Sequence, residues 1–224
     1  MTIKAIFFDL DDTLFSEIDY IKSGFNNVSK VLATRLDLPS SAIYKQLLEL
    51  FNANPGNVFN RLFDELQILY SDDDILSLVR LYRKHRPTIE FCSDVIPCLM
   101  QLRAEGIRTG IITDGYKETQ NNKLKALKAD RCFEHIIITD ELGREYWKPH
   151  PFSFELVRDW LQVDFNEMMY VGDNPGKDFY IGTIYPIVTV RIDRNGIYSN
   201  TPYLHGVKEK VRIKTLLELP NMAS

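Results

Sequence analysis

Short apolar runs alternate with amphipathic stretches over most of this chain. Runs rich in β-branched or aromatic residues predict five buried strands, at residues 3–8, 107–113, 135–139, 168–171 and 188–192. The stretches between them include apolar residues three and four apart, which predict helices at 117–127 and 152–161, and a helical turn at 177–182. Strands that alternate with helices predict a parallel sheet with right-handed crossovers, and therefore an α/β fold.

One long segment interrupts this alternation. From Ser16 to about Pro87 the apolar residues follow helical spacing without a convincing strand, and they predict four helices. The acidic triplet Asp72-Asp73-Asp74 opens the fourth of these helices, where the helix dipole favours negative charge. We therefore expect a Rossmann-like core of residues 1–15 and 88–224, with helices on both faces of its parallel sheet. Residues 16–87 would form a helical-bundle cap inserted into that core.

Composition narrows the class of protein. The 224 residues are 45% hydrophobic and 26% charged, ordinary values for a soluble domain, and the formal net charge is −4. Because the chain has no basic block, we expect no nucleic acid as a partner. It also has no apolar run of about 20 residues, so we expect no membrane. Three sparse cysteines without disulfide or zinc-site spacing, and an N-terminal run unlike a signal peptide, favour the cytoplasm.

Three carboxylates follow the first expected strand directly, in the run Asp9-Leu10-Asp11-Asp12-Thr13. Asp9 and Asp11 would project the same way if the extended backbone persists to this point. Crowded carboxylates repel one another, so protons, basic side chains or a cation must offset their charge. Mg²⁺ prefers one or two carboxylates, waters and a substrate phosphate, and ligands of α/β sheets bind at the carboxyl ends of strands. By itself, the run is equally compatible with a turn or a helix cap at Asp12 or Thr13.

Three further signals lie where the sheet predicts strand ends or adjoining loops. Thr113-Asp114-Gly115 ends the second expected strand, and Lys148 lies in the loop before a helix. Gly172-Asp173-Asn174 follows the fourth strand, with Asp178 shortly after it. Each of these has a simpler interpretation as a strand-end residue, a solvated lysine, a turn or a helix cap. Together they would bring a hydroxyl, an ammonium group and further carboxylates to the first cluster.

These signals, in this order, resemble the four motifs of the haloacid dehalogenase-like (HAD) superfamily of phosphatases. The resemblance rests on Asp9-Leu10-Asp11-Asp12-Thr13, Thr113, Lys148 and Gly172-Asp173 with Asp178, and it spans almost the whole chain. A helical insert between the first and second motifs is similar to the family branch with a helical cap. The resemblance implies a Mg²⁺-dependent phosphatase that acts on a small phosphorylated metabolite. We expect a monomer or a homodimer.

The resemblance also implies a role for each matched residue. Asp9 would be the nucleophile that forms an aspartyl-phosphate, and Asp11 the general acid and base. Phosphate would be bound by the second and third motifs: Thr113, the backbone N–H groups of Asp114 and Gly115, and Lys148, which would also offset the charge of Asp9. The metal would be held by the first and fourth motifs: Asp9, the backbone carbonyl of Asp11, and Asp173. Three neighbours would orient these groups: Asp178, Asn174 and Thr13.

Several reactions stay open at this point. Asp11 favours ester hydrolysis over dehalogenation, because an oxygen leaving group needs a proton and a halide does not. A phosphomutase uses the same site, although Asp12-Thr13 differs from the glycine and valine usual in sugar phosphomutases. A phosphonatase would need a lysine from the cap, and no cap lysine stands out. A catalytically silent binding protein is a further alternative, whereas a signalling receiver domain would carry its nucleophile after the third strand.

Overall fold

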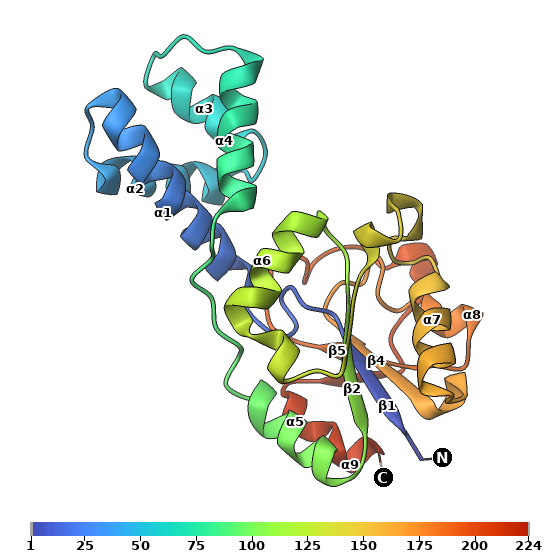
Figure 1. Cartoon of the computed structure of the whole chain (residues 1–224). Helices are drawn as coiled ribbons and strands as arrows, with labels where there is room; N and C mark the ends of the chain where they lie inside the picture. Colours follow the sequence, from blue (N-terminus) through green and yellow to red (C-terminus); the bar gives the residue numbers. More distant parts are fainter. Residues whose placement is uncertain (1, 224) are drawn as a thin grey trace. The chain divides into compact units, whose positions relative to one another are not determined.

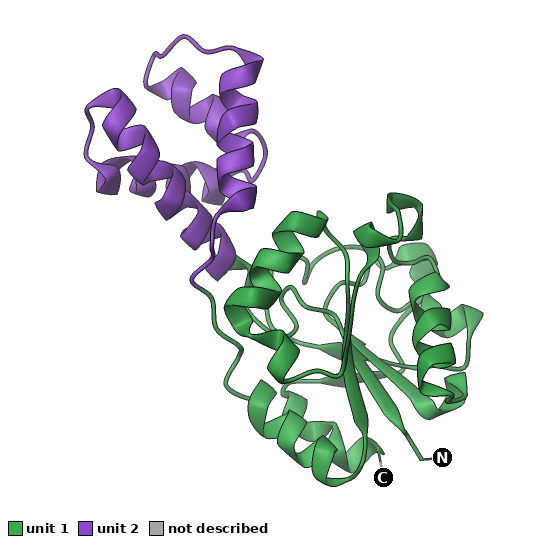
Figure 2. Ribbon diagram, in the orientation of Figure 1, with its two compact units in different colours: residues 1–18, 89–224 green, residues 19–88 purple. Residues whose placement is uncertain are grey.

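The computed structural model describes residues 2–223 of the chain. It divides into two compact units, one of residues 1–18 and 89–224 and the other of residues 19–88 (Figure 2). The first unit contains the sheet, and the second is built from helices alone among the elements described. The sequence led us to expect a helical insert at 16–87, close to the range of the second unit.

Six parallel strands form the sheet, in the order β3-β2-β1-β4-β5-β6. Their bounds are β1 Ala5–Phe8, β2 Arg108–Thr113, β3 His135–Ile138, β4 Met168–Gly172, β5 Val188–Ile192 and β6 Val211–Ile213. The first five match strands expected from the sequence, which confirms the parallel α/β class. The sequence did not predict β6, because its three residues lie among charged neighbours and its central Arg212 is exposed.

Helices cover both faces of this sheet. The helices α5 (Val95–Ala104) and α6 (Lys117–Leu127) lie on one side, and α7 (Phe152–Leu161) and α8 (Ile181–Ile184) lie on the other (Figure 1). The bounds of α6 and α7 are those that the apolar spacing predicted, whereas the turn expected at 177–182 forms a helix only from Ile181. The chain also has a terminal helix and short 3₁₀ turns: α9 Pro220–Ala223, Ala129–Arg131, Thr139–Glu141, Arg144–Tyr146, Phe165–Glu167, Leu204–Gly206 and Leu216–Glu218.

The strand order determines where a ligand can bind. Strand β1 pairs with β2 on one side and with β4 on the other. The chain runs outward from β1 through β2 and β3 and then crosses to β4, so the direction of winding reverses between β1 and β4. The carboxyl ends of strands at such a reversal form a crevice outside the sheet. Asp9 follows β1 and Asp173 follows β4, so both carboxylates lie at this crevice.

The helical unit has an aromatic core. Its elements are α1, which begins in the first unit, and three further helices: α1 Glu17–Leu36, α2 Ser40–Ala53, α3 Val58–Glu65 and α4 Asp72–Lys84. The ring of Phe25 packs against Phe51, Phe59 and Tyr82, with centroids 5.8–6.2 Å apart. Ser71 and Asp74 form a capping box at the start of α4, so the acidic triplet serves to begin a helix.

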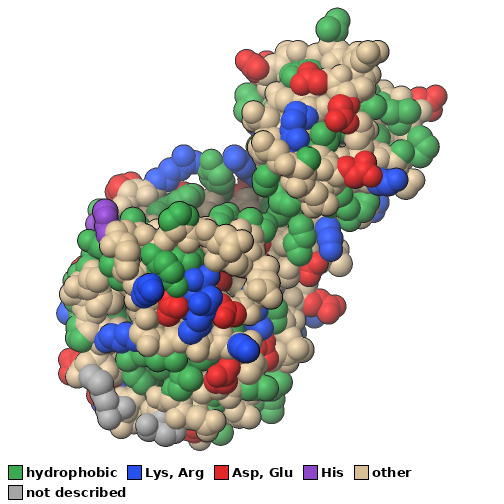
Figure 3. Space-filling model, turned by 180° about the vertical axis from the view of Figure 1, so that it is seen from behind, with side chains coloured by type: hydrophobic (Ala, Val, Ile, Leu, Met, Phe, Trp, Pro, Cys, Tyr) green, Lys and Arg blue, Asp and Glu red, His purple; other side chains and the backbone are tan. Residues whose placement is uncertain are grey.

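The surface carries both signs of charge, and the cysteines form no disulfide. In the face seen in Figure 3, acidic and basic side chains lie beside one another on the larger unit. All three cysteines are free thiols, with Cys98 buried and the other two half-buried. Within the described residues, no helix combines the length and the apolar character needed to cross a bilayer.

Candidate active site

Three buried carboxylates meet at the crevice between β1 and β4. Asp9, Asp173 and Asp178 each place a carboxylate oxygen within 4.8 Å of the others. Asp9 and Asp173 follow strand ends directly, and Asp178 is brought back to them by the loop after β4. Like charges at this separation repel strongly in a buried site, so the arrangement requires protons or cations.

Lys148 supplies one positive charge to this cluster. Its side chain is 1% exposed, and its ammonium group donates to Asp9 Oδ1 at 2.5 Å, Tyr170 Oη at 2.6 Å and Asp178 Oδ1 at 2.9 Å. Burial lowers the pKa of Lys148, but the charges of Asp178 and Asp9 more than compensate and raise it well above its usual value. Lys148 is therefore a permanent cation, shared between two carboxylates.

Burial, together with the remaining negative charge, raises the pKa of Asp9 and of Asp173. Burial is the main cause that raises the pKa of Asp9 to about 6, against the opposing charge of Lys148. Burial, followed by the charges of Asp178 and Asp9, raises the pKa of Asp173 to about 9. Asp173 Oδ2 is buried and has no hydrogen-bond partner among the described residues, while Thr13 Oγ1 lies 3.5 Å from Asp173 Oδ1.

This donor set fits a divalent cation. A buried carboxylate oxygen without a partner is costly unless a proton or a metal ion satisfies it. Clustered carboxylate oxygens with no sulfur or imidazole among them suit a hard ion such as Mg²⁺. The residues present therefore fit the metal that the resemblance implied, and the carboxylate of Asp178 lies within the same cluster.

Asp11 has a different set of partners, although only Leu10 separates it from Asp9. Its Oδ1 accepts a hydrogen bond from Lys123 Nζ at 2.7 Å, and its Oδ2 accepts one from Gln120 Nε2 at 3.0 Å. Lys123 also pairs with Glu17 at 2.9 Å. Burial raises the pKa of Asp11, but Lys123 and these hydrogen bonds outweigh it and the net pKa is lowered.

The condition for Asp9 and Asp11 to project the same way, an extended backbone through both residues, does not hold. Strand β1 ends at Phe8, so the extended backbone on which that expectation depended stops before either carboxylate. Asp12 then adopts a left-handed conformation with φ 50°, and its carboxylate accepts the backbone N–H groups of Glu17 and Ile197 at 2.9 and 2.8 Å. Asp12 thus caps α1, as the simpler interpretation of the motif suggested.

The loop after β2 is fixed by side chains. Gln120 donates to Thr113 Oγ1 at 2.7 Å, and the hydroxyl of Thr113 in turn donates to the backbone carbonyl of Asp114 at 3.4 Å. The carboxylate of Asp114 accepts from Thr139 Oγ1 at 2.7 Å and from the backbone N–H of Lys148 at 3.1 Å. Gly115 follows with φ 131°, a conformation that favours glycine. Asp114 therefore joins the second and third motifs.

The loop after β4 depends on glycine at position 172, which has no side chain. A Cβ atom at Gly172 would lie 2.4 Å from Asp178 Oδ2, so glycine leaves the space that this carboxylate occupies. The backbone N–H of Asn174 donates to Asp178 Oδ2 at 2.9 Å. The side chain of Asn174 accepts from the N–H of Gly176, also at 2.9 Å. Gly172 and Asn174 therefore help to hold Asp178 beside Lys148.

Four site residues were not identified from the sequence: Lys123, Gln120, Tyr170 and Lys177. Lys123 and Gln120 are three residues apart on α6, a spacing that gives helical neighbours but no recognisable motif. Tyr170 reads as one more apolar residue of β4. Lys177 donates to Asp114 Oδ2 at 3.1 Å, and its position between two motif carboxylates, Asp173 and Asp178, was a signal that could have been used.

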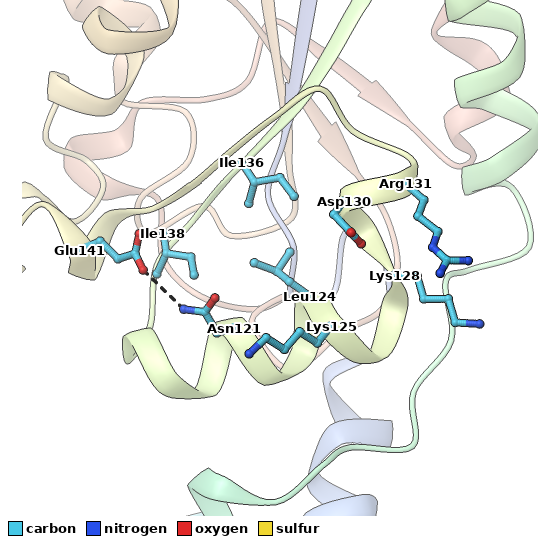
Figure 4. Close-up of a pocket in the computed structure, with 9 residues that line it drawn as sticks. All are labelled: Asn121, Leu124, Lys125, Lys128, Asp130, Arg131, Ile136, Ile138 and Glu141. Carbon is cyan, nitrogen blue, oxygen red and sulfur yellow. Dashed lines mark hydrogen bonds between the residues drawn. The ribbon is translucent and has the colours of Figure 1, made fainter.

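A separate pocket of about 520 Å³ lies beside α6 (Figure 4). Its lining includes Leu124, Ile136 and Ile138, with Lys125 and Lys128 among its charged residues. None of the residues predicted for the active site lines it. The pocket is therefore distinct from the carboxylate cluster.

Comparison with known proteins agrees with this geometry. The family described as haloacid dehalogenase-like hydrolase matches residues 6–185. The chain is 33% identical to a glyceraldehyde 3-phosphate phosphatase of Pyrococcus abyssi, over 80% of this chain and 76% of that protein. It is 32% identical to a protein of the same name from Methanopyrus kandleri, over 88% and 87%. A HAD phosphatase from Thermococcus onnurineus has a related structure, with a TM-score of 0.62, 25% identity and coverage of 98% and 97%. The chain therefore belongs to the haloacid dehalogenase-like hydrolases.

Proposed function

We propose that this hydrolase is a Mg²⁺-dependent phosphatase that cleaves a small phosphorylated metabolite through an aspartyl-phosphate. The observation that carries the proposal is the buried group of Asp9, Asp173 and Asp178 with Lys148 beside it. Phosphoryl transfer depends mainly on positioning and on neutralising charge, and this group offers both. The names of the relatives, which are phosphatases, support the same reaction class.

In the first step, a carboxylate oxygen of Asp9 attacks phosphorus and the bond to the ester oxygen breaks. Asp11 gives a proton to the departing alkoxide, so that an alcohol leaves. In the second step, water attacks phosphorus, Asp11 takes the proton of that water, and Asp9 is released with inorganic phosphate. Both oxygens of Asp11 accept hydrogen bonds from α6 and its pKa is lowered, so its carboxylate must leave this position and take up a proton before it can act as the acid.

Phosphate would be bound by Thr113, by the backbone N–H groups of Asp114 and Gly115, and by positive charge at Lys148. Mg²⁺ would be held by Asp9, the carbonyl of Asp11 and Asp173, with Asp178, Asn174 and Thr13 supporting them. When bound, the cation neutralises the carboxylates and the transferring phosphoryl oxygens. The orphaned oxygen of Asp173 is the feature that favours a metal here.

We propose that the helical unit, residues 19–88, is the cap domain of this hydrolase. The relatives named glyceraldehyde 3-phosphate phosphatase suggest a three-carbon phosphate as the first compound to test. We further propose a cytoplasmic enzyme that works as a monomer or homodimer, in keeping with its three free thiols.

The test is phosphate release from a panel of phosphorylated metabolites, with Mg²⁺ and with chelator, for the wild type and Asp9→Asn. We expect release that requires Mg²⁺ and is absent in the variant. Release that continues in Asp9→Asn would remove the nucleophile assignment. No release from any compound would favour a mutase or a silent binding protein. Lys210→Gln, at an exposed lysine, is the matched control.

A further inference from the structure

The family resemblance assigns the positive charge of Lys148 to the phosphoryl group. In this structure, however, other groups of the protein accept all three N–H donors of this lysine. An ammonium group has three N–H donors, and those of Lys148 have three acceptors: Asp9, Tyr170 and Asp178. Tyr170 accepts from Lys148 while its own hydroxyl donates to the carbonyl of Ile112 at 3.2 Å. Lys148 can neutralise the site, but in this arrangement it has no N–H left for a phosphate oxygen.

A second lysine in the same site is available. Lys177 Nζ has one hydrogen-bond partner within the described part of the chain, Asp114 Oδ2 at 3.1 Å. Its side chain is 25% exposed, against 1% for Lys148, so it is the more accessible of the two lysines. Two of its N–H donors are thus free of protein acceptors.

The surroundings of Lys177 connect it to the loop proposed to bind phosphate. Its partner Asp114 directly follows Thr113, and the charges of Lys148, Asp9 and Asp114 all act on Lys177. The charge of Lys177 likewise acts on Asp9, the proposed nucleophile. Lys177 is therefore bonded to the loop that would bind phosphate, and its charge acts on the carboxylate that would attack.

We propose that Lys177 donates directly to the phosphoryl oxygens, while Lys148 supplies positive charge to the site and holds Asp9 and Asp178 in place. This assignment rests on the proposed phosphatase function. It divides between two lysines the tasks that the resemblance gave to one. Lys177 would bind with two N–H groups while its third stays on Asp114, so the phosphate would be tied to the loop after β2.

The experiment measures the binding of inorganic phosphate by calorimetry in the presence of Mg²⁺. Lys177→Gln should weaken binding about 10-fold to 100-fold, the usual worth of hydrogen bonds from a charged group, and Lys177→Arg should recover part of the loss. Lys210→Gln should bind as the wild type does. Equal binding by Lys177→Gln and the wild type, or no phosphate binding by the wild type, would overturn the proposal.

A second background separates direct binding from an indirect effect through Asp114. In Asp114→Asn protein, the ion pair with Lys177 is already weakened. Adding Lys177→Gln should still lower phosphate affinity about 10-fold or more if Lys177 touches the ligand. No further loss in this background would show that Lys177 acts only by positioning Asp114, which contradicts the proposal.

A measurement on the wild type keeps the test independent of how the variants fold. Inorganic phosphate with Mg²⁺ should slow the acetylation of Lys177 and leave that of Lys210 unchanged, as read by mass spectrometry. Unchanged acetylation of Lys177 would overturn the proposal. Because phosphate binding needs no turnover, a protein that hydrolyses no ester but shows these differences would refute the phosphatase function alone. Ester hydrolysis without these differences would refute only the role of Lys177.

Discussion

Asp9 and Asp11 are two residues apart, yet the protein treats them in opposite ways. Asp9 shares one lysine with another carboxylate, and burial raises its pKa to about 6. Asp11 has Lys123 and Gln120 on its two oxygens, and its net pKa is lowered. On the side of Asp9, three clustered carboxylates outnumber Lys148, the lysine bonded to them, so this side is suited to a cation. The side of Asp11 is already neutralised and holds its carboxylate at rest.

The sharpest way to break this comparison is to neutralise each carboxylate in turn. Asp9→Asn should abolish turnover, because no oxygen nucleophile is left, while the melting temperature should stay near that of the wild type. Phosphate release and thermal melting measured together check this. A variant that is inactive because it has unfolded would not support the assignment.

Asp11→Asn should be less severe. We expect a loss of about 10²–10⁴ in rate on an alkyl phosphate, the usual contribution of general acid–base catalysis. On an aryl phosphate, whose leaving group needs little protonation, the first step should be nearly spared while the second stays slow. Rapid mixing should therefore show a burst of phenol that is absent for Asp9→Asn. Equal losses of the first step on both esters would contradict the role of Asp11.

The two buried lysines should differ in what they contribute to stability. Lys148→Met leaves Asp9 and Asp178 buried without their cation, which should cost about 3–5 kcal/mol in the free energy of unfolding. Lys123→Met leaves Asp11 and Glu17, which are 19% and 17% exposed and so retain some water. Its cost should be smaller, about 1–3 kcal/mol.

Urea unfolding with a chelator present measures both variants, with Lys210→Met as the surface control. Equal costs for the two buried lysines would remove the contrast between the two sides of the site.

A further expected effect concerns pH. The folded pKa of Asp173, about 9, lies above the unfolded value of about 3.9. The metal-free fold therefore binds an extra proton between these limits and loses stability as the pH rises through them. Because Mg²⁺ replaces that proton, its stabilising effect should grow from pH 5 to pH 9, towards about 2.7 kcal/mol at 100 times Kd.

Melting curves with and without Mg²⁺ at several pH values test this expectation. Asp173→Asn should remove the growth with pH, and an equal Mg²⁺ effect at acidic and alkaline pH in the wild type would refute it.

What the sequence predicted and what it missed have different physical origins. Asp9, Thr113 and Asp173 could be found because each stands at the end of an apolar strand, where a local pattern marks the position. Lys123 and Gln120 reach the site from the face of a helix, so only the packing of α6 reveals them. Strand β6 was missed because pairing with β5, and not an apolar run of its own, makes it a strand.

The space left by Gly172 limits how this site could be built into another parallel sheet. Alanine would be the better strand residue, since it restricts the unfolded chain. Its methyl group, however, would take the volume that the carboxylate of Asp178 fills. The graft would then lose a counter-charge of Lys148 without any charged residue having been changed. A site designer should therefore copy the empty space at position 172 as faithfully as the acids and lysines around it.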